Sequence, residues 1–396
     1  MISVTEAKDI LHRVTLVPKI MRCALPEAIG YILAEDIYAL TDIPAFNQSS
    51  MDGYAFAFAD WQSNQELQVV AAVPAGRGDR LVLRKGEAAR VFTGAPLPEG
   101  ADTVVMQEVT EVQQNRLTIQ QPALQRGDNF RPQGSEIREG EPALPAGTPV
   151  TASAIGFIAG MGHQQVVVYA PPAVTIIITG DELQTPGEPL QYGQVYEASS
   201  FMLRAALTQM GITHINVLYA ADNLSATVTA LQQALQGADI VLLTGGVSVG
   251  DFDFVVKATE QCGVQQLFHR VKQRPGKPLY AGVKGLVTVF GLPGNPSSVL
   301  TCFYQYVWPL LRRCMGQQPA LTQLQVPLAA QHYKPHQLTH FLKGHYHNGS
   351  VTVLAAQESY RMRSFAVANC FVALEEPSRQ YEAQEQVTIF LLPNYG

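Results

Sequence analysis

Features of small secreted proteins and of membrane proteins are missing from this sequence. Its 396 residues contain 5 cysteines without CxxC spacing, which argues against a disulfide framework or a zinc site. Charged residues stand at Glu6, Lys8, Asp9 and Arg13, where a signal peptide needs an apolar stretch. The longest uncharged helical candidate, 297–311, is shorter than a membrane span. These absences predict a protein of the reducing cytoplasm with no membrane partner.

An excess of basic charge is also missing, because the formal net charge is −6. Nucleic acids and acidic membranes select basic surfaces, so neither is an expected partner. Internal repeats and low-complexity tracts are absent as well. The length, together with a hydrophobic content of 47%, predicts a soluble protein of about two to four domains.

Strand-like and helix-like segments alternate from Val174 onwards. Strands are expected at VTIII, INVLYA and DIVLLTGG, and helices at ASSFMLRAALTQMG, NLSATVTALQQALQGA and FDFVVKATEQCG. This alternation predicts a doubly wound, parallel α/β domain over residues 168–316. In such sheets ligands bind beyond the carboxyl ends of the strands, where the glycine-rich turns of this sequence fall.

The remaining segments predict three further parts of an α/β multidomain protein. Residues 1–40 and 140–167 are expected to form a helical or linker domain, with helices over 5–14 and 25–37. Residues 41–139 hold short β-like runs broken by prolines, which is typical of a β-rich inserted domain. Short alternating segments over 317–396 predict a small C-terminal β domain that resembles a barrel.

The turn TGGVSVGDFD, which follows a buried strand, is the first candidate site. Gly245, Gly246 and Gly250 let the backbone approach a ligand and point N–H groups at an anion. Asp251 and Asp253 would repel phosphate unless a hard cation such as Mg²⁺ lay between. The pattern therefore suggests a magnesium-assisted phosphate or pyrophosphate site. The alternative is a plain tight turn with Asp251 as a helix N-cap.

Two more strand ends carry polar residues. Asp181 and Glu182 follow the strand VTIII, where two carboxylates either hold Mg²⁺ or cap the next turn. In GLPGNPSS, Pro296 is expected to be the first residue of a helix. The free N–H groups of that helix, with the hydroxyls of Ser297 and Ser298, would suit an anion.

Basic residues gather in HRVKQRPGKPL, residues 269–279, of an otherwise acidic chain. If this segment is an extended strand, Arg270, Lys272 and Arg274 point the same way and converge on one anion. Lys277 follows in the PGKP turn. The alternative is an edge strand that is protected by solvated charge.

The β-rich part offers two weaker motifs. Asp52 lies in NQSSMDGYAF and Thr93 in RVFTGAPLPEG. Each segment also has a simple structural explanation, a tight turn for the first and a stiff loop for the second.

Five histidines near the C-terminus have a spacing that suggests a transition-metal site. Pro335 interrupts any helix that would align them, so a polar surface loop is the preferred interpretation. The histidines are His332, His336, His340, His345 and His347.

MDGYA, TGAP, ITGDEL, TGGVSVGDFD, PGKP and GLPGNP together occur in the order and spacing of the molybdopterin molybdenumtransferase family, to which the C-terminal part of gephyrin is similar. The resemblance covers nearly the whole chain. It implies four subdomains and an elongated homodimer, with the active site between the α/β domain of one subunit and the β-rich insert of the other. It also implies hydrolysis of adenylylated molybdopterin, departure of AMP and entry of molybdate, with Mg²⁺ as cofactor. A molybdopterin adenylyltransferase is a candidate partner.

The resemblance assigns roles to individual residues. The implied catalytic residues are Asp52, Glu182, Asp253, Arg274 and Lys277, and Glu182 and Asp253 are the implied metal ligands. The implied substrate-binding residues are Thr93, Asp222, Gly245, Gly246, Ser248, Gly250, Arg270, Pro293, Asn295, Pro296 and Ser298.

Departures from the family pattern leave a second hypothesis open. Arg274 and Arg270 stand where the family often has lysine, and arginine brings a planar fork in place of a compact ammonium. Glu136 replaces an aspartate, and Ala221 with Asp222 replaces a pair of aspartates. The alternative is therefore a non-catalytic or altered-specificity paralogue that binds molybdopterin or a related nucleotide as a carrier or scaffold.

Overall fold

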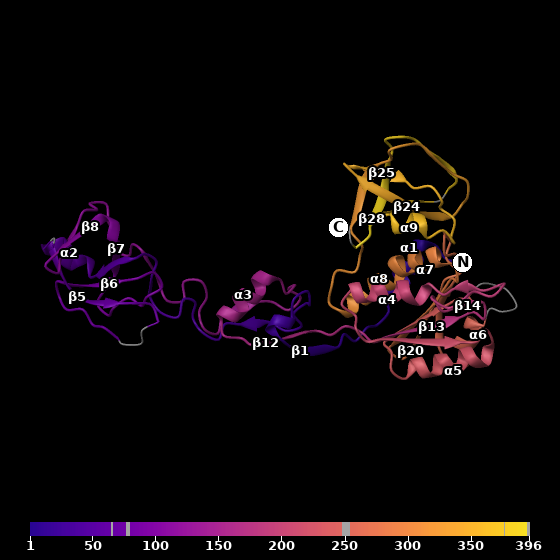
Figure 1. Ribbon diagram of the computed structural model, residues 1–396, viewed down its shortest axis with the longest axis horizontal. Coiled ribbons are helices and arrows are strands. Elements are labelled where there is room, and N and C mark those ends of the chain that lie inside the picture. Colours follow the sequence, from indigo (N-terminus) through magenta and orange to yellow (C-terminus); the bar gives the residue numbers. More distant parts are fainter. Residues whose placement is uncertain (65, 77–79, 248–253, 376, 394–396) are drawn as a thin grey trace. The chain divides into compact units, whose positions relative to one another are not determined.

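The computed structural model describes residues 1–396 except 65, 77–79, 248–253, 376 and 394–396. The chain forms two compact units (Figure 1). We call Met1–Met21 with Tyr169–Gly396 the main unit, and Arg22–Val168 the insert unit. The division into four domains with the boundaries given above stays a prediction.

A six-stranded sheet in the order β16-β13-β17-β21-β20-β18 organises the main unit. The first four strands in this order are parallel, and β20 and β18 add antiparallel pairs. The strands are β13 (Val174–Thr179), β16 (Ile215–Ala220), β17 (Ile240–Thr244), β18 (Gln265–His269), β20 (Tyr280–Lys284) and β21 (Val287–Leu292).

Helices cover both faces of this sheet, as Figure 1 shows for α4 and α5. Ile176 and Ile178 of β13 pack with α1, α4 and α7–α8, whereas Ile177 packs with α5 and α6. Alternate residues of one strand thus enter two cores, which explains its unbroken apolar run. The doubly wound α/β fold is confirmed. The helices are α1 (Val4–His12), α4 (Ser199–Gln209), α5 (Leu224–Leu235), α6 (Val255–Gln261), α7 (Pro296–Cys302), the π-helical turn η3 (Phe303–Val307) and α8 (Trp308–Cys314).

A second sheet follows in the main unit, in the order β19-β24-β26-β28-β22, with β25 paired to β24. The short strand β19 directly precedes the PGKP turn. It runs parallel to β24 and so connects the basic segment to the C-terminal part. The elements are β19 (Gln273–Arg274), β22 (Gln323–Pro327), β23 (His332–Lys334), β24 (Thr339–His347), β25 (Ser350–Val353), α9 (Arg363–Ala366), β26 (Cys370–Leu374), β27 (Arg379–Tyr381) and β28 (Gln386–Leu391).

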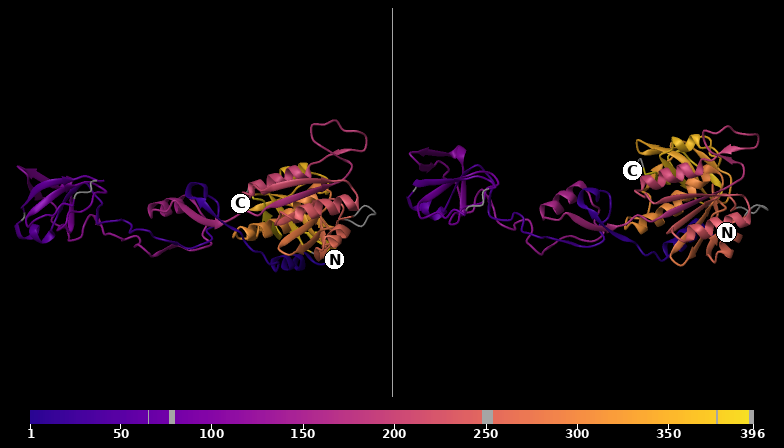
Figure 2. Two further views of the ribbon diagram at one scale, coloured as in Figure 1. Left: turned by 90° about the horizontal axis from the view of Figure 1, so that it is seen from below. Right: turned by 60° about the horizontal axis from the view of Figure 1, so that its bottom comes forward.

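A two-stranded parallel sheet lies in the segment that joins β13 to α4. It consists of β14 (Leu183–Gln184) and β15 (Val195–Tyr196). Figure 2 shows the loop between them extending away from the body of the main unit.

The insert unit is built mainly from short strands around a sheet in the order β7-β4-β6-β5-β9-β8. Phe56, Leu67 and Leu117 are buried on one face of it, and Ala55, Val91 and Val104 on the other. The sheet strands are β4 (Gly53–Phe56), β5 (Glu66–Val73), β6 (Glu87–Val91), β7 (Thr103–Met106), β8 (Thr110–Gln113) and β9 (Arg116–Ile119). The other elements are β2 (Ile37–Tyr38), β3 (Gln48–Ser49), α2 (Phe58–Asn64), η2 (Gln107–Val109), β10 (Phe130–Arg131), β11 (Pro142–Leu144) and α3 (Ala152–Gly160), and β1 (Ile20–Ala24) pairs with β12 (Gln165–Tyr169).

The prediction of a helix over residues 25–37 is wrong. Only the single turn η1 (Leu25–Glu27) forms, and Gly30 follows it with a φ of +83°. Ile32 and Leu33 are buried in extended bridges to Pro149 and Val168. The spacing of these apolar residues therefore reflects pairing with distant segments and not one face of a helix.

The helices of the described chain segments differ from membrane spans. None of them combines the length and the apolar character that crossing a bilayer requires.

Candidate active site

A cavity of about 210 Å³ lies where the parallel strands of the main unit end. The turns after β13, β16, β17 and β21 all contribute to its wall, because the carboxyl ends of parallel strands share one edge of the sheet. The lining residues are Thr179, Gly180, Glu182, Asp222, Gly245, Gly246, Val247, Pro278, Pro293 and Gly294. The chain thus brings five of the predicted site residues to one place.

The turn after β17 contains glycine where a side chain would not fit. Gly245 has a φ of +87°, and a Cβ atom there would lie 2.8 Å from Thr179 Oγ1. Gly246 also has a positive φ, of +61°. The N–H of Gly245 donates to Leu292 O at 3.2 Å, so this group holds β17 against β21 rather than facing a ligand. Ser248, Gly250, Asp251 and Asp253 lie outside the described residues.

Carboxylates from two different turns line the cavity. A Cβ atom on Gly180 would lie 2.8 Å from Glu182 Oε2, so glycine leaves room for this carboxylate beside the end of β13. Asp181 belongs to the same turn, and its Oδ1 accepts the N–H of Asp222 at 3.0 Å. The turns after β13 and β16 are thereby joined.

These oxygen donors fit a hard cation such as Mg²⁺ in kind. Within the ranges that the structure describes, no group of three or more His, Cys, Asp or Glu side chains is arranged to hold a metal ion. Glu182 and Asp222 therefore supply part of a donor set, and the predicted second ligand, Asp253, lies outside the described residues.

The basic segment after β18 is not the continuous strand that was expected over residues 270–274. Arg270 has a φ of +70°, and its N–H donates to Leu279 O at 2.8 Å. Val271 pairs with Ile2, and only Gln273 and Arg274 form a strand, β19. The alternation argument is therefore wrong for Arg270, because a turn precedes the strand. Arg274 is exposed on β19.

The side chain of Gln273 fixes the PGKP turn through hydrogen bonds to its backbone. Its buried side-chain Nε2 donates to Pro275 O at 3.0 Å and to Gly276 O at 3.3 Å, while its Oε1 accepts the Tyr306 hydroxyl. A buried amide with both ends bonded fixes a turn firmly. This cradle positions the exposed Arg274 and Lys277 on either side of the turn.

Gly276→Ala is expected to lower the free energy of unfolding of the main unit by about 2 kcal/mol or more. Gly276 has a φ of +85°, and a Cβ atom would lie 2.4 Å from Cys302 Sγ in a fully buried contact. Gly285→Ala is the matched control, since Gly285 also has a positive φ, of +58°, but has no atom within 4 Å of the added Cβ. Thermal and urea unfolding measure both. Equal losses would show that Cys302 does not restrict this position.

The turn after β21 leads into α7. Asn295 occupies the N-cap, and its Nδ2 donates to Ser359 Oγ at 3.0 Å instead of capping the helix. The N–H of Ser297 donates to Ser359 O at 3.2 Å and that of Ser298 to Asn295 O at 2.9 Å. These bonds occupy two N–H groups that were expected to face an anion. Pro293 lines the cavity, whereas Asn295, Pro296 and Ser298 are not among its lining residues.

Asp52 and Thr93 form a pair within the insert unit. Asp52 Oδ1 accepts both the N–H of Thr93, at 2.7 Å, and its hydroxyl, at 2.8 Å. The Thr93 backbone bond, then the hydroxyl bond, and then the charge of Arg90 hold the pKa of Asp52 below its usual range. Asp52 is therefore ionised at neutral pH. The next residue, Gly53, has to be glycine, because a Cβ atom there would lie 1.9 Å from Val105 O.

The sequence matches three family descriptions in chain order. "MoeA N-terminal region (domain I and II)" covers residues 2–162, "Probable molybdopterin binding domain" covers 175–313, and "MoeA C-terminal region (domain IV)" covers 325–392. A protein of Staphylococcus epidermidis named molybdopterin molybdenumtransferase is 32% identical over 98% of this chain and 95% of its own length. The chain belongs to the molybdopterin molybdenumtransferase family. It is an enzyme of molybdenum cofactor biosynthesis.

Other members of the molybdopterin molybdenumtransferase family support this assignment. A protein of that name from Nostoc is 40% identical over 73% of this chain and 68% of its own length. The crystal structure of a molybdopterin biosynthesis MoeA protein from Pyrococcus horikoshii matches with a TM-score of 0.88 and 28% identity, covering 99% of both chains. The α/β multidomain fold class is thereby confirmed.

Some residues of the candidate site were not singled out from the sequence. Thr179 lies beneath Gly245 and donates its hydroxyl to Thr244 O at 3.0 Å, and Gln273 and Tyr306 hold the PGKP turn. Thr179 stands in a run of β-branched residues, where a structural role explains it equally well. No local signal distinguishes Gln273 or Tyr306, because each acts through a partner distant in sequence.

The C-terminal histidines do not all lie in a polar surface loop. His340 lies on β24 and is 7% exposed, so the prediction is wrong for this residue. Its ring centroid is 4.7 Å from that of His336, and burial, followed by the charges of His336 and Arg274, lowers the pKa of His340 to about 3. Both rings are neutral at pH 7. They lie beside Arg274, which pairs with His340 across β19 and β24.

Proposed function

We propose that this enzyme inserts molybdate into adenylylated molybdopterin with release of AMP, in the presence of Mg²⁺. The proposal is carried by one observation, a cavity that combines glycine-shaped turns with the carboxylates of Glu182 and Asp222, in a chain of this family. Water cleaves the phosphoanhydride bond and AMP leaves. The two dithiolene sulfurs then bond to molybdenum, and their protons leave with one oxygen of molybdate as water.

The residues of the main unit divide this work. The turns with Gly245 and Gly246 admit a flat, phosphorylated substrate close to the backbone. Glu182, with Asp253, would hold Mg²⁺, which offsets the negative charge of the phosphates when it is bound. Arg274 and Lys277, presented by the Gln273 cradle, offer positive charge to the molybdate oxyanion.

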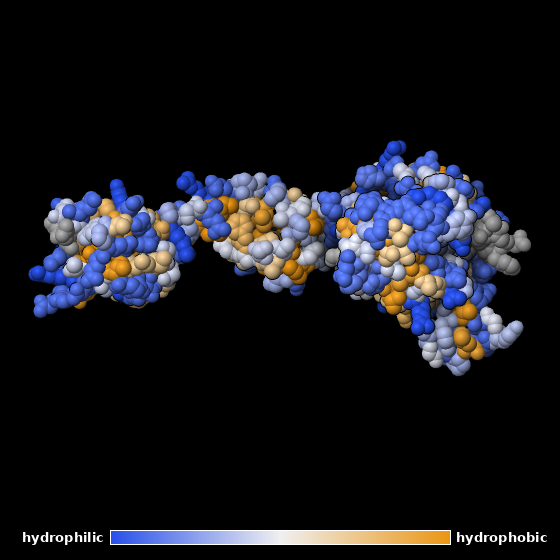
Figure 3. Space-filling model, turned by 90° about the horizontal axis from the view of Figure 1, so that it is seen from above, coloured by the Kyte–Doolittle hydropathy of each residue, from blue (hydrophilic) through white to orange (hydrophobic). Residues whose placement is uncertain are grey.

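The active form in this proposal is a homodimer, in which Asp52 of one subunit completes the site of the other. Large apolar side chains reach the surface in both units, including those of Ile29, Leu40, Phe201 and Tyr219. Figure 3 shows hydrophobic residues among hydrophilic ones over one face of the molecule. These exposed apolar side chains are available for the subunit contacts and for the substrate-supplying adenylyltransferase that the proposal includes.

An assay of purified protein tests the function directly. AMP release from adenylylated molybdopterin is expected to depend on both molybdate and Mg²⁺, and the product should activate a molybdenum-free apoenzyme. Tight binding of adenylylated molybdopterin without AMP release would instead identify the carrier or scaffold paralogue.

The same assay tests the shared site. Subunits with Asp52→Asn mixed with subunits with Glu182→Gln should regain activity, because one site of each mixed dimer has both carboxylates intact. Light scattering checks the dimer. No regained activity from a demonstrably mixed dimer would place Asp52 and Glu182 in the same subunit's site.

A further inference from the structure

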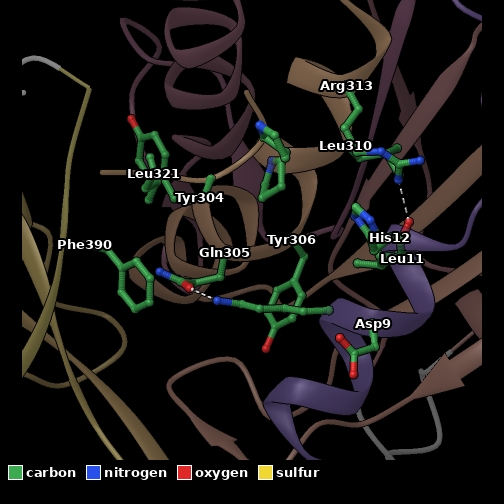
Figure 4. A pocket seen from close by; sticks show the side chains of 14 residues that line it. Asp9, Leu11, His12, Tyr304, Gln305, Tyr306, Leu310, Arg313, Leu321 and Phe390 are labelled. Carbon is green, nitrogen blue, oxygen red and sulfur yellow. Dashed lines mark hydrogen bonds between the residues drawn. The ribbon is translucent and has the colours of Figure 1, made fainter. Parts of the chain in front are cut away.

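A second cavity of the main unit lies between α1, η3, α8 and β28 (Figure 4). Its volume is about 250 Å³, and it shares no lining residue with the cavity at the strand ends. The lining residues are Lys8, Asp9, Leu11, His12, Tyr304, Gln305, Tyr306, Pro309, Leu310, Arg313, Pro319, Ala320, Leu321 and Phe390.

Most of this wall is apolar. Tyr304, Leu310, Leu321 and Phe390 face the space from three different segments of the chain. An apolar cavity of about 150 Å³ already accommodates a benzene ring. The space therefore has room for one ring or branched alkyl group together with a small polar group.

One cation of the wall, Lys8, has no acidic partner among the residues that the structure describes. The Lys8 amino group donates to Gln305 Oε1 at 2.8 Å and lies 4.8 Å from the ring centroid of Phe390. None of the ion pairs found between described residues includes Lys8. Figure 4 shows Asp9 well separated from the end of Gln305 that meets Lys8. An amino group has three donors, so Lys8 can still bind an acceptor.

An unsatisfied donor lies beside this cation. Gln305 is 2% exposed, and its Nε2 is buried and has no hydrogen-bond partner within the described parts of the chain. A buried polar group in this state is costly unless an acceptor reaches it. Its Oε1 already accepts from Lys8, so the amide orientation leaves Nε2 directed along the wall towards Phe390 (Figure 4).

The arginine of the wall is already engaged. Arg313 donates to Leu11 O at 3.0 Å and to Val14 O at 3.2 Å, at the C-terminal end of α1. Lys8 and Gln305 together therefore make an unpaired cation and an unpaired N–H donor at one end of an apolar space. The chemistry that complements them is a carboxylate attached to an apolar group.

We propose that this cavity binds a small monocarboxylic acid with one aromatic or branched apolar group. The carboxylate accepts from Lys8 Nζ and Gln305 Nε2, and the apolar group packs among the tyrosine, leucine and phenylalanine side chains of the wall. The cavity shares no lining residue with the cavity at the strand ends, and neither Lys8 nor Gln305 has a part in the proposed reaction, so neither proposal depends on the other.

The binding should depend on pH through Lys8. Burial among apolar groups lowers the pKa of Lys8 to about 8, so the charge that attracts the carboxylate is lost above that value. The titratable and charged groups around it are Asp9 and His12 of α1, Tyr304 and Tyr306 of η3, and Arg313 of α8. Burial raises the pKa of both tyrosines, so they stay neutral between pH 7 and pH 9.5.

Calorimetry with phenylacetate and with 2-phenylethanol, its neutral counterpart, tests the site. Lys8→Met, which keeps an apolar stem without the charge, is expected to weaken phenylacetate binding by about ten- to a hundredfold and to leave 2-phenylethanol binding unchanged. Lys284→Met, on an exposed lysine of the same unit, is the matched control and should change neither.

The pH series keeps the test valid if Lys8→Met does not fold. Phenylacetate affinity of the wild type should fall about tenfold between pH 8 and pH 9.5, whereas 2-phenylethanol affinity should stay constant. The proposal is overturned if phenylacetate does not bind, if its affinity is equal in wild type and Lys8→Met, or if it is equal at the two pH values.

Discussion

Glu182→Gln is expected to lower AMP release by about a hundredfold or more and to raise the Mg²⁺ concentration needed for half-maximal activity. The substitution removes one negative charge from the wall of the cavity at the strand ends and changes the side-chain volume little. Because Gly180 leaves space for this carboxylate, the glutamine fits without moving β13. Asp253→Asn is expected to have the same two effects.

The measurement is AMP release as a function of Mg²⁺ concentration, with circular dichroism and thermal unfolding as checks of the fold. Glu188→Gln is the matched control, because Glu188 is exposed in the neighbouring loop and does not line the cavity. If Glu182→Gln and Asp253→Asn keep wild-type activity at limiting Mg²⁺, neither carboxylate holds the cation.

Arg274→Ala is expected to raise the half-saturating molybdate concentration by about ten- to a hundredfold, because one charge-assisted contact to the oxyanion is lost. Binding of adenylylated molybdopterin should change much less. The Gln273 cradle bonds the backbone oxygens of Pro275 and Gly276, so the turn keeps its shape without the arginine side chain.

Arg274→Lys separates charge from geometry. It should keep most of the activity if positive charge alone matters, and lose it if the planar fork of arginine binds two oxygens of molybdate. Arg204→Ala, at an exposed position on α4, serves as control. An unchanged half-saturating molybdate concentration in Arg274→Ala would show that the oxyanion binds elsewhere, with the region of Ser298 as the next candidate.

The α/β core was predictable because its signals are local. Asn223 caps α5 by accepting the N–H of Ala226, and the apolar runs of β13 and β17 follow from helices on both faces of the sheet. Gly180 and Gly245 mark strand ends for the same reason, since both have a positive φ, and Gly180 also relieves crowding with Glu182 in its own turn. The position of the cavity follows from these elements through the rule for parallel sheets.

The errors arose where partners distant in sequence decide the structure. Leu33 is extended because it pairs with Val168, and the turn at Arg270 lies between Ile2 and Leu279. Gln273 and Tyr306 are separated by 33 positions, yet their contact holds the turn that carries Arg274. The spacing of apolar residues does not indicate such contacts. The sequence could therefore place the basic segment near the site but could not give its conformation.

The place of α1 in the main unit sets an order of folding during synthesis. Lys8 contacts Gln305, 297 positions later, and Leu11 contacts Arg313, 302 positions later. At about 5–20 residues per second, the ribosome needs about 15–60 s to make these partners after α1 has been made. The insert unit is complete within that interval and can fold first. Ala7 and Leu11, which end in the core of the main unit, cannot be fully buried before η3 and α8 have been made.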